Sequence, residues 1–303
     1  MLSADLYTSK RQSLQHIEIT EMAPPKFSDL NKQVSDIFNK GFFFNVFKLD
    51  VKTRTANGVN FNVVGEHNTE TSRTSGSLET KYVVPEYGLT FLEKWNTDNL
   101  LKCEITADNR LAEGFKVVFD ASLVPNTGKK TAELRTAYTH DKAHVETNVA
   151  FDKDGPILNG ALVLGHQGWL GGYQYVFNTA RSTLTKNNFA VGFKAKDFTL
   201  FANMNDGNEV GGSVYQRIND QLETGVQLAW TAGSNQTRFA LASKYQLDSQ
   251  TLVSAKVNNI CQVGLSFQQL LRPGVKLTLS ALFEAKNLNA GGHKVGFGLE
   301  LDA

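Results

Sequence analysis

The sequence predicts an all-β protein, a transmembrane β-barrel of about 19 strands with one N-terminal α-helix inside the pore. Hydrophobic and polar residues alternate with a period of two from about position 45 to the C-terminus, and no linker interrupts them. No run of ~18 apolar residues is present, which excludes a membrane-spanning helix. Charged residues make up 20% of the chain and the mean hydropathy is -0.27, so averages alone resemble those of a soluble protein. The periodicity therefore decides the fold class.

The first part of the chain differs from the rest. Residues 1–25 are predicted to be an irregular extension, and they lack the apolar core of a signal peptide. Residues 26–41 are predicted to form a helix and a hinge, with Ser28 or Asp29 capping the start and Gly41 following the end. The apolar residues of this stretch recur at the spacing of one helical face: Phe27, Leu30, Val34, Ile37 and Phe38. A helix of ~13 residues is marginal by itself, so it must dock on another part of the protein.

Residues 42–303 are predicted to form the barrel. In segment 47–54, Phe47, Leu49 and Val51 alternate with charged residues, and segments 143–151, 275–283 and 294–302 repeat the pattern. Similar segments lie near 59–67, 75–84, 115–123, 188–194, 222–230 and 238–246. Turn signals such as Asn57-Gly58 separate them. The length after position 45 allows roughly 19–20 strands of ~9–11 residues, the span that a tilted membrane strand needs.

A soluble multi-sheet β protein would show the same alternation, but a single soluble sheet rarely contains so many strands without splitting. Aromatic residues recur near the segment ends, as in the interfacial girdles of membrane barrels. These aromatic residues are Tyr82, Trp95, Tyr138, Trp169, Tyr215, Trp230 and Tyr245. The two patterns together favour the membrane barrel.

Several function classes have no support in the sequence. A formal net charge of +1 gives no reason to expect a nucleic-acid partner. Cys103 and Cys261 cannot make a disulfide framework, and no metal-ligand spacing is present. No phosphate-binding glycine loop or nucleophile elbow occurs. We therefore expect no enzymatic activity, no bound metal and no required cofactor.

Eight short segments carry a family resemblance: LETKY at 78–82, YGLTF at 87–91, EKWNTDN at 93–99, PNTGKK at 125–130, NFAVG at 188–192, LAWTAG at 228–233, SAKVNN at 254–259 and NAGGHK at 289–294. They resemble the voltage-dependent anion channel of the mitochondrial outer membrane, and the resemblance runs from Met22 to the C-terminus. The count of 19 strands comes with this resemblance, and an odd count requires the first and last strands to pair in parallel. The resemblance implies voltage-gated, weakly anion-selective passage of metabolites, nucleotides and small ions across that membrane.

The polar faces of the strands would line such a pore. The predicted lumenal bases are Lys48, Lys52, Arg54, Lys81, Lys94, Lys116, Lys194, Arg238, Lys244, Lys256, Lys276 and Lys294. The predicted lumenal acids are Asp50, Glu66, Glu79, Asp120, Glu146, Glu300 and Asp302. Bases outnumber acids in this sample, so we expect a modest preference for anions that weakens as salt screens the charges.

Glu93 is the residue that departs most from its surroundings. It shares a strand face with Leu89, Phe91 and Trp95, which places a carboxylate on the lipid side of the barrel. Ionisable residues within a membrane are candidates for function. The family resemblance implies roles in lipid contact and partner binding for an acid at this place, the alternative being a rim position wetted by headgroups.

The helix is the second candidate site, with Lys32, Asp36, Lys40 and Gly41 as its pore and gating residues. Lys32 and Lys40 would meet the phosphates of passing nucleotides, and the resemblance implies a helix inside the barrel that takes part in gating. Family members usually carry several glycines after this helix, whereas the present chain reads GFFFN at 41–45. A single glycine predicts a stiffer hinge. The alternative is a helix that only packs inside the barrel.

The resemblance also implies ligands and partners. Nucleotide contacts, with NAD(H) or ATP as ligands, are expected at Gln262, Val263, Gly264, Ser280, Ala281, Leu282, Phe283 and Glu284, although Gln262 departs from the family pattern. Membrane lipids, permeating anions, hexokinase-type and apoptosis-regulating proteins, and further copies of this chain are the expected partners. A protein-import pore of the same membrane and a soluble β binding protein are the alternative functions.

Overall fold

The computed structural model describes residues 23–303 except 111, 153, 235–236, 287 and 290. Most of the predicted irregular extension, residues 1–22, lies outside the described residues. Residues 23–25 contain neither helix nor strand.

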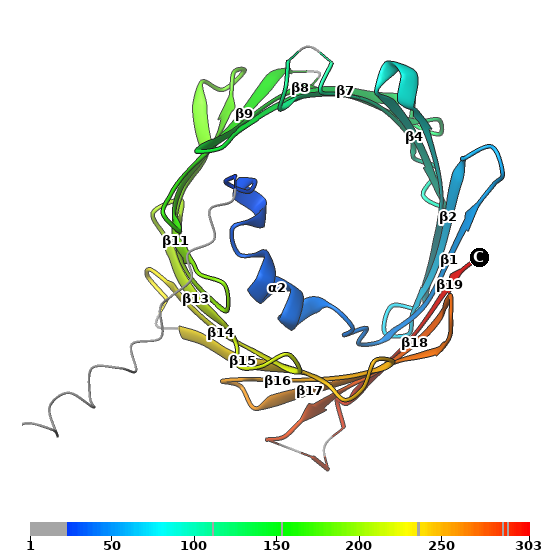
Figure 1. Cartoon of the computed structure of the whole chain (residues 1–303), viewed down its shortest axis with the longest axis vertical. Helices are drawn as coiled ribbons and strands as arrows, with labels where there is room; N and C mark the ends of the chain where they lie inside the picture. Colours follow the sequence, from blue (N-terminus) through cyan, green and yellow to red (C-terminus); the bar gives the residue numbers. More distant parts are fainter. Residues whose placement is uncertain (1–22, 111, 153, 235–236, 287, 290) are drawn as a thin grey trace, which may run out of the picture.

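Nineteen strands form one closed ring around an N-terminal helix (Figure 1). Each strand pairs antiparallel with the next, because the turns that connect them are short enough to bring neighbours together. The strands are β1 (Val46–Arg54), β2 (Asn60–Asn68), β3 (Arg73–Val84), β4 (Leu89–Asn96), β5 (Leu101–Asp108), β6 (Phe115–Val124), β7 (Lys129–His140), β8 (Ala143–Asp152), β9 (Gly155–His166), β10 (Trp169–Asn178), β11 (Thr183–Lys194), β12 (Phe198–Asn205), β13 (Glu209–Arg217), β14 (Leu222–Thr231), β15 (Thr237–Gln246), β16 (Thr251–Asn258), β17 (Gln262–Arg272), β18 (Val275–Glu284) and β19 (Lys294–Asp302). The structure thus confirms the predicted fold class.

The ring closes through a parallel pair, β1 with β19. The pairing runs in register from Phe47 opposite Phe297 to Lys52 opposite Asp302. The backbone N–H of Ala303 donates to the carbonyl of Lys52 at 2.9 Å, which extends the closure to the last residue. An odd number of alternating strands leaves the first and last strands pointing the same way, so only a parallel pair can close the ring.

The two faces of the ring have opposite chemistry. On β1, Phe47 and Leu49 face outward and are 46% and 45% exposed, whereas Lys48 and Asp50 face the lumen. Large apolar side chains on most other strands are exposed in the same way. Soluble proteins rarely expose contiguous apolar surface on this scale. The arrangement excludes the soluble β binding protein, because its apolar residues would face inward.

No described helix has the length and apolar character needed to cross a membrane.

The predicted helix is divided into two pieces. A 3-10 turn, η2, covers Phe27–Asp29, and the α-helix α2 covers Lys32–Asn39. The prediction of a continuous helix capped by Ser28 or Asp29 is wrong. Asn31 is the N-terminal cap residue of α2, but its side chain caps nothing, because Asn31 Oδ1 accepts a hydrogen bond from Ser213 Oγ at 2.7 Å. Contact with the barrel wall therefore takes precedence over local capping.

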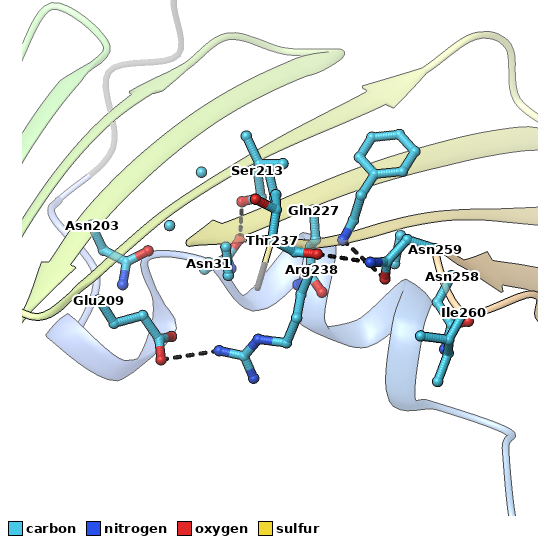
Figure 2. Close-up of a pocket in the computed structure, with 16 residues that line it drawn as sticks. Asn31, Asn203, Glu209, Ser213, Gln227, Thr237, Arg238, Asn258, Asn259 and Ile260 are labelled. Atoms are coloured by element: carbon cyan, nitrogen blue, oxygen red, sulfur yellow. Dashed lines mark hydrogen bonds and ion pairs between the residues drawn. The ribbon is translucent and has the colours of Figure 1, made fainter. Parts of the chain in front are cut away.

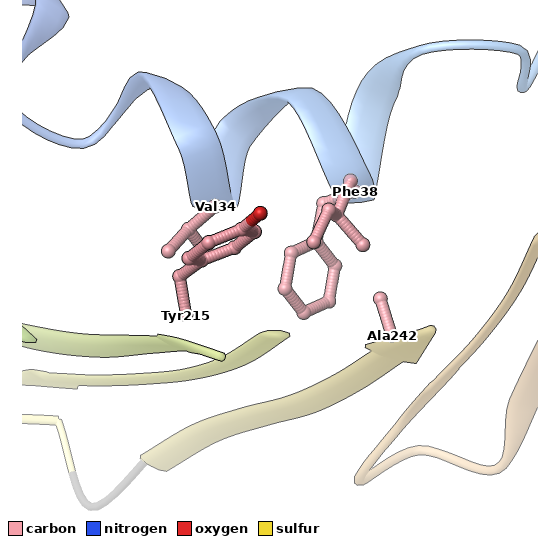
Figure 3. Packing of buried hydrophobic residues seen from close by; sticks show 5 residues of the cluster. Val34, Phe38, Tyr215 and Ala242 are labelled. Atoms are coloured by element: carbon pink, nitrogen blue, oxygen red, sulfur yellow. The ribbon is translucent and has the colours of Figure 1, made fainter. Parts of the chain in front are cut away.

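Both pieces dock through apolar side chains onto the inner wall. Leu30 packs with Val163, Ala190 and Phe201 of β9, β11 and β12. Figure 3 shows the second cluster, in which Val34, Ile37 and Phe38 of α2 meet Tyr215 of β13 and Ala242 of β15. Val34 is 1% exposed and Ile37 3%, so the amphipathic helix buries its apolar face completely. This confirms that the helix lies inside the barrel.

Candidate functional site in the barrel lumen

Polar contacts fix the position of α2 along the wall. Thr199 Oγ1 on β12 donates to Gln33 Oε1 at 2.7 Å. At the other end, Lys256 Nζ on β16 donates to the carbonyl of Phe38 at 2.7 Å. A cation at the C-terminus of a helix satisfies a free carbonyl and complements the helix dipole. The helix is therefore held at both ends as well as along its apolar face.

Residues 40–45 connect α2 to β1, and we call them the connector. Ser266 Oγ donates to the carbonyl of Gly41 at 2.6 Å, and the backbone N–H of Phe43 donates to Ser280 Oγ at 3.0 Å. A Cβ at Gly296 would lie 1.4 Å from the carbonyl oxygen of Phe43, so only glycine fits beneath the connector there. Gly41 itself has φ +84°, a conformation that favours glycine. The connector is therefore bound to the wall along its length.

Aromatic side chains strengthen this attachment. Lys256 Nζ lies 4.2 Å from the ring centroid of Phe42 and 5.0 Å from that of Phe44, so one cation contacts two aromatic rings. Cation–π contacts of this kind contribute about 0.5–2 kcal/mol each, depending on desolvation. The stiffer hinge expected of GFFFN stays a prediction, and the contacts of Phe42 and Phe44 with Lys256 support it.

The polar side of α2 faces the lumen. Lys32 and Lys40 are exposed there, as their proposed contact with passing phosphates requires. Lys40 Nζ forms an ion pair with Asp36 Oδ2 at 2.7 Å, whereas Lys32 makes no hydrogen bond or ion pair with another described residue. Of the predicted gating residues, Lys32 is therefore the one whose charge is free to meet an anion.

The two parts of the docked segment lie against stretches of wall that differ in charge. The lumenal faces of β13, β14 and β15 behind α2 carry Glu209, Arg217, Glu223, Arg238 and Lys244, whereas the strand register places no charged side chain on the lumenal face of β9 or β10, which contact η2. Apolar helix residues can dock there without burying a charge. Charged residues also line the lumenal faces of β1–β8, which lie on the other side of the ring from α2 (Figure 1). Permeating ions must therefore pass between the polar side of α2 and a charged wall.

Every base and acid predicted to line the lumen does so, but the sequence sample was incomplete. The register adds the bases Arg73, Lys102, Lys129, Arg135, Lys186 and Arg217, and the acids Glu104, Asp108, Glu133, Asp152, Glu209, Glu223 and Glu284. The excess of bases persists but is proportionally smaller than the sample indicated. Many of these bases also form ion pairs with neighbouring acids. Asp120, which is 5% exposed, accepts hydrogen bonds from Lys102 at 2.7 Å and from Arg135 at 2.6 Å.

Figure 2 shows a recess of about 880 Å³ between the start of α2 and strands β12–β16. Its one base, Arg238, forms an ion pair with Glu209 at 3.0 Å. Most of its other polar lining is neutral, including Asn31, Asn203 and Asn258. The recess offers space to a small polar solute but no free charge to hold an anion.

The sequence profile described as eukaryotic porin matches residues 23–296 of this chain. The chain belongs to the eukaryotic porin family. It is 56% identical over 285 residues to the non-selective voltage-gated ion channel VDAC2 of Meleagris gallopavo, covering 94% of this chain and 96% of that protein. It is 55% identical over 280 residues to the non-selective voltage-gated ion channel VDAC1 of Homo sapiens, covering 92% of this chain and 99% of that protein. The family resemblance drawn from the short segments is thereby confirmed.

Glu93 of this porin lies in the middle of β4 and faces outward. Its neighbours across the strands are Thr80 and Cys103, and Phe91 and Trp95 flank it on the same face. On the described strands Glu93 is the only acidic side chain with this outward orientation. The predicted orientation is therefore found, and the position is far from both ends of the strand, which argues against the rim alternative.

The residues proposed for nucleotide contact do not share one surface in this porin. Strand alternation turns Val263, Ala281 and Phe283 outward. The connector covers two of the inward residues, Ser280 and Gly264. Ser280 Oγ accepts a hydrogen bond from the backbone N–H of Phe43, and a Cβ at Gly264 would lie 2.9 Å from the Phe44 ring. Of the proposed set, a solute in the lumen can reach Gln262, Leu282 and Glu284, and Gln262 Nε2 already donates to Glu284 Oε1 at 2.6 Å.

Sequence reasoning missed the wall residues that hold the helix. Thr199, Ser213 and Ser266 are small polar residues on lumenal faces, and nothing in their local sequence distinguishes them from other pore-lining residues. Lys256 was predicted to line the lumen, but its contact with the helix C-terminus was not foreseen. The signal that could have found them is the need of a docked helix for partners at its free backbone groups.

Proposed function

We propose that this porin is a voltage-gated diffusion channel for small ions, metabolites and nucleotides in the mitochondrial outer membrane, with a slight preference for anions. The observation that carries the proposal is the inverted polarity of the closed ring, apolar outside and charged inside. Such a ring leaves no strand edge unpaired in lipid, and it surrounds a polar path. The relatives' names as voltage-gated ion channels and their identity of 55–56% support the same function.

The charge pattern argues for weak selectivity. Bases exceed acids on the lumenal faces, but ion pairs such as Lys276 with Glu300 at 3.3 Å and Lys244 with Glu223 at 3.6 Å cancel much of the field. The remaining charges lie in an aqueous pore, where screening acts within ~10 Å at 0.1 M salt. We therefore expect a mild preference for chloride over potassium that declines with salt.

The protein-import alternative has no support. An import pore needs an acidic or apolar lumen to receive basic presequences, whereas this lumen, taken over all its described strands, has more bases than acids. The family and the named relatives are porins and ion channels. The description of the family as porins supports the expectation that the chain has no enzymatic activity.

Lipids and the partners expected from the resemblance belong to the proposal as well. Glu93 on the outward face would contact lipid or a protein within the membrane, and hexokinase-type proteins, apoptosis regulators or another copy of this chain would meet that surface. Channel activity would need no cofactor, and NAD(H) or ATP would act as a permeating ligand.

Single-channel recording in a planar bilayer under a KCl gradient tests the proposal. We expect a large conductance, a reversal potential on the chloride side, and closure to states of lower conductance at high voltage. The absence of conductance from folded protein inserted in the bilayer would refute the channel function.

A further inference from the structure

The recess between the start of α2 and strands β12–β16 exists because small residues line the wall there. The register places Gly211 of β13 opposite Ala229 of β14 on the lumenal face. Ala240 of β15 also faces the lumen, opposite Gln227 of β14. None of these three small residues extends far from the wall, so a space of about 880 Å³ is left beside the helix (Figure 2). This volume lies within the range of small-molecule sites, about 300–1,000 Å³.

Carboxamide side chains lie next to these small residues. Asn203 of β12 is opposite Gly211, and a Cβ at Gly211 would be 2.6 Å from Asn203 Oδ1, so the amide lies over the glycine. Gln227 is on the same face of β14 as Ala229. Neither Asn203 nor Gln227 makes a side-chain hydrogen bond with another described residue. Because a primary amide both donates and accepts, these two side chains can form hydrogen bonds of both kinds with a solute.

The docked segment contributes a third amide. Asn31 Oδ1 accepts a hydrogen bond from Ser213 Oγ at 2.7 Å, and the Asn31 amide nitrogen has no partner among the described residues. A solute in the recess can therefore accept from Asn31 of the docked segment while it forms hydrogen bonds with Asn203 or Gln227 of the wall. Such a solute would connect α2 to the barrel.

The charges of the recess are balanced. Arg238 and Glu209 are the one base and the one acid of the lining, and they form an ion pair at 3.0 Å. An ion therefore gains little attraction from the recess, and salt screens what remains. A neutral molecule with several hydroxyls gains more, because each hydroxyl can donate to an amide oxygen and accept from an amide N–H.

We propose that the recess binds a neutral polyol of monosaccharide size, and that the bound polyol stabilises the docked position of α2. Asn203 and Gln227 hold the hydroxyls on the wall side, and Asn31 holds one on the helix side. The recess is thus a regulatory site beside the docked helix. Its effect on gating rests on the proposed channel function: closure that depends on helix movement needs a higher voltage when the polyol is bound.

Saturation-transfer difference NMR with the full chain in a detergent without sugar groups tests the site, with sorbitol as the probe. From the small binding energy per atom of such ligands, we expect saturable binding with a dissociation constant of about 1–10 mM. The test variant N203A/Q227A should raise that constant about tenfold, because two hydrogen-bonding side chains are lost. The matched control N62A/N159A removes two lumenal amides outside the recess that also make no side-chain hydrogen bond with a described residue, and it should change the constant about twofold or less.

Amide hydrogen exchange of residues 34–39 tests the effect on the helix. At a sorbitol concentration ten times the measured dissociation constant, exchange in the wild type should slow about tenfold, because the polyol binds only the docked state. N203A/Q227A at the same concentration should change about twofold or less. That comparison separates binding in the recess from the general effect of an osmolyte on folded proteins.

Several results would overturn the proposal. They are a sorbitol signal that rises without saturation, equal weakening in both double variants, and no weakening in either. Glycine betaine, a zwitterion without hydroxyls, should bind at least about tenfold more weakly than sorbitol, and equal binding would show that hydroxyls are not recognised. Equal slowing of exchange in the wild type and N203A/Q227A would remove the effect on α2. Potassium chloride conductance should persist in every variant, so failure of the recess and failure of the channel are distinguishable.

Discussion

Replacing Phe38 by alanine should release α2 from the barrel wall. Phe38 is 6% exposed and packs with Tyr215 and Ala242, and its ring lies 3.4 Å from the position of a Cβ built on Gly225. Truncation of a buried phenylalanine costs about 3–5 kcal/mol, and the low end applies here because lumenal water can fill the space. A loss of about 3 kcal/mol lowers the ratio of docked to undocked helix about a hundredfold.

This magnitude is comparable to what a membrane voltage can supply. Residues 26–40 contain three lysines and two aspartates, so the segment has one net positive charge. Moving one charge across the whole field gains about 2.3 kcal/mol per 100 mV. In the wild type that energy competes with the whole set of contacts that hold the helix. Without the Phe38 ring, closure that depends on helix movement should occur at lower voltage.

Amide hydrogen exchange of residues 34–39 in detergent micelles measures the release directly. We expect exchange in F38A to be about a hundredfold faster than in the wild type, in line with the lost burial energy. K32Q is the control, because Lys32 is exposed and contributes nothing to the cluster; its exchange should stay within about threefold. A change in F38A as small as that of the control would refute the reasoning that this cluster holds the helix.

Three further predictions concern other parts of the barrel. A Cβ at Gly298 would lie 2.7 Å from a ring carbon of Phe43 in the connector, so G298V should lower the free energy of unfolding by about 1–3 kcal/mol. G171V is the control and should leave the free energy of unfolding unchanged, because a Cβ at Gly171 would have no atom within 4 Å. Thermal melts of both variants check this. The hydrogen bond from Lys294 holds the pKa of Glu70 below its usual value, so its stabilising effect should be present at neutral pH and disappear as pH falls through the folded pKa. The melting temperatures of wild type and E70Q should therefore differ at neutral pH and converge in strong acid. E93Q should stabilise the barrel in bilayers by about 1 kcal/mol, because it removes a lipid-facing charge, and equal unfolding free energies would contradict this.

The strands could be predicted from the sequence because one face of each is exposed to lipid. Period-2 alternation located β1, β8 and β18 to within one residue of their observed ends. The break between η2 and α2 could not be predicted, because it depends on Asn31 meeting Ser213 of a distant strand. Local propensity contains no information about such a partner.

The ion pairs between neighbouring strands could not be predicted from the sequence either. Arg135 of β7 reaches both Asp120 of β6 and Glu104 of β5, a contact that depends on the register of three strands. The lengths of the turns set that register, and a register shift of one residue would turn every side chain of the strand to the opposite face of the sheet. The proposed nucleotide residues at 262–264 and 280–284 show the same limit, because consecutive residues of a strand cannot all face one ligand.

The seam between β1 and β19 sets the order in which the barrel can be completed. Its two strands lie far apart in the sequence, so the ring remains open until β19 has been synthesised and inserted. Until then two unpaired edges are available, and either can recruit a strand from another copy. Loss of β19 would therefore leave the edges of β1 and β18 unpaired, and the protein would be prone to aggregation and to binding by partners that cover strand edges.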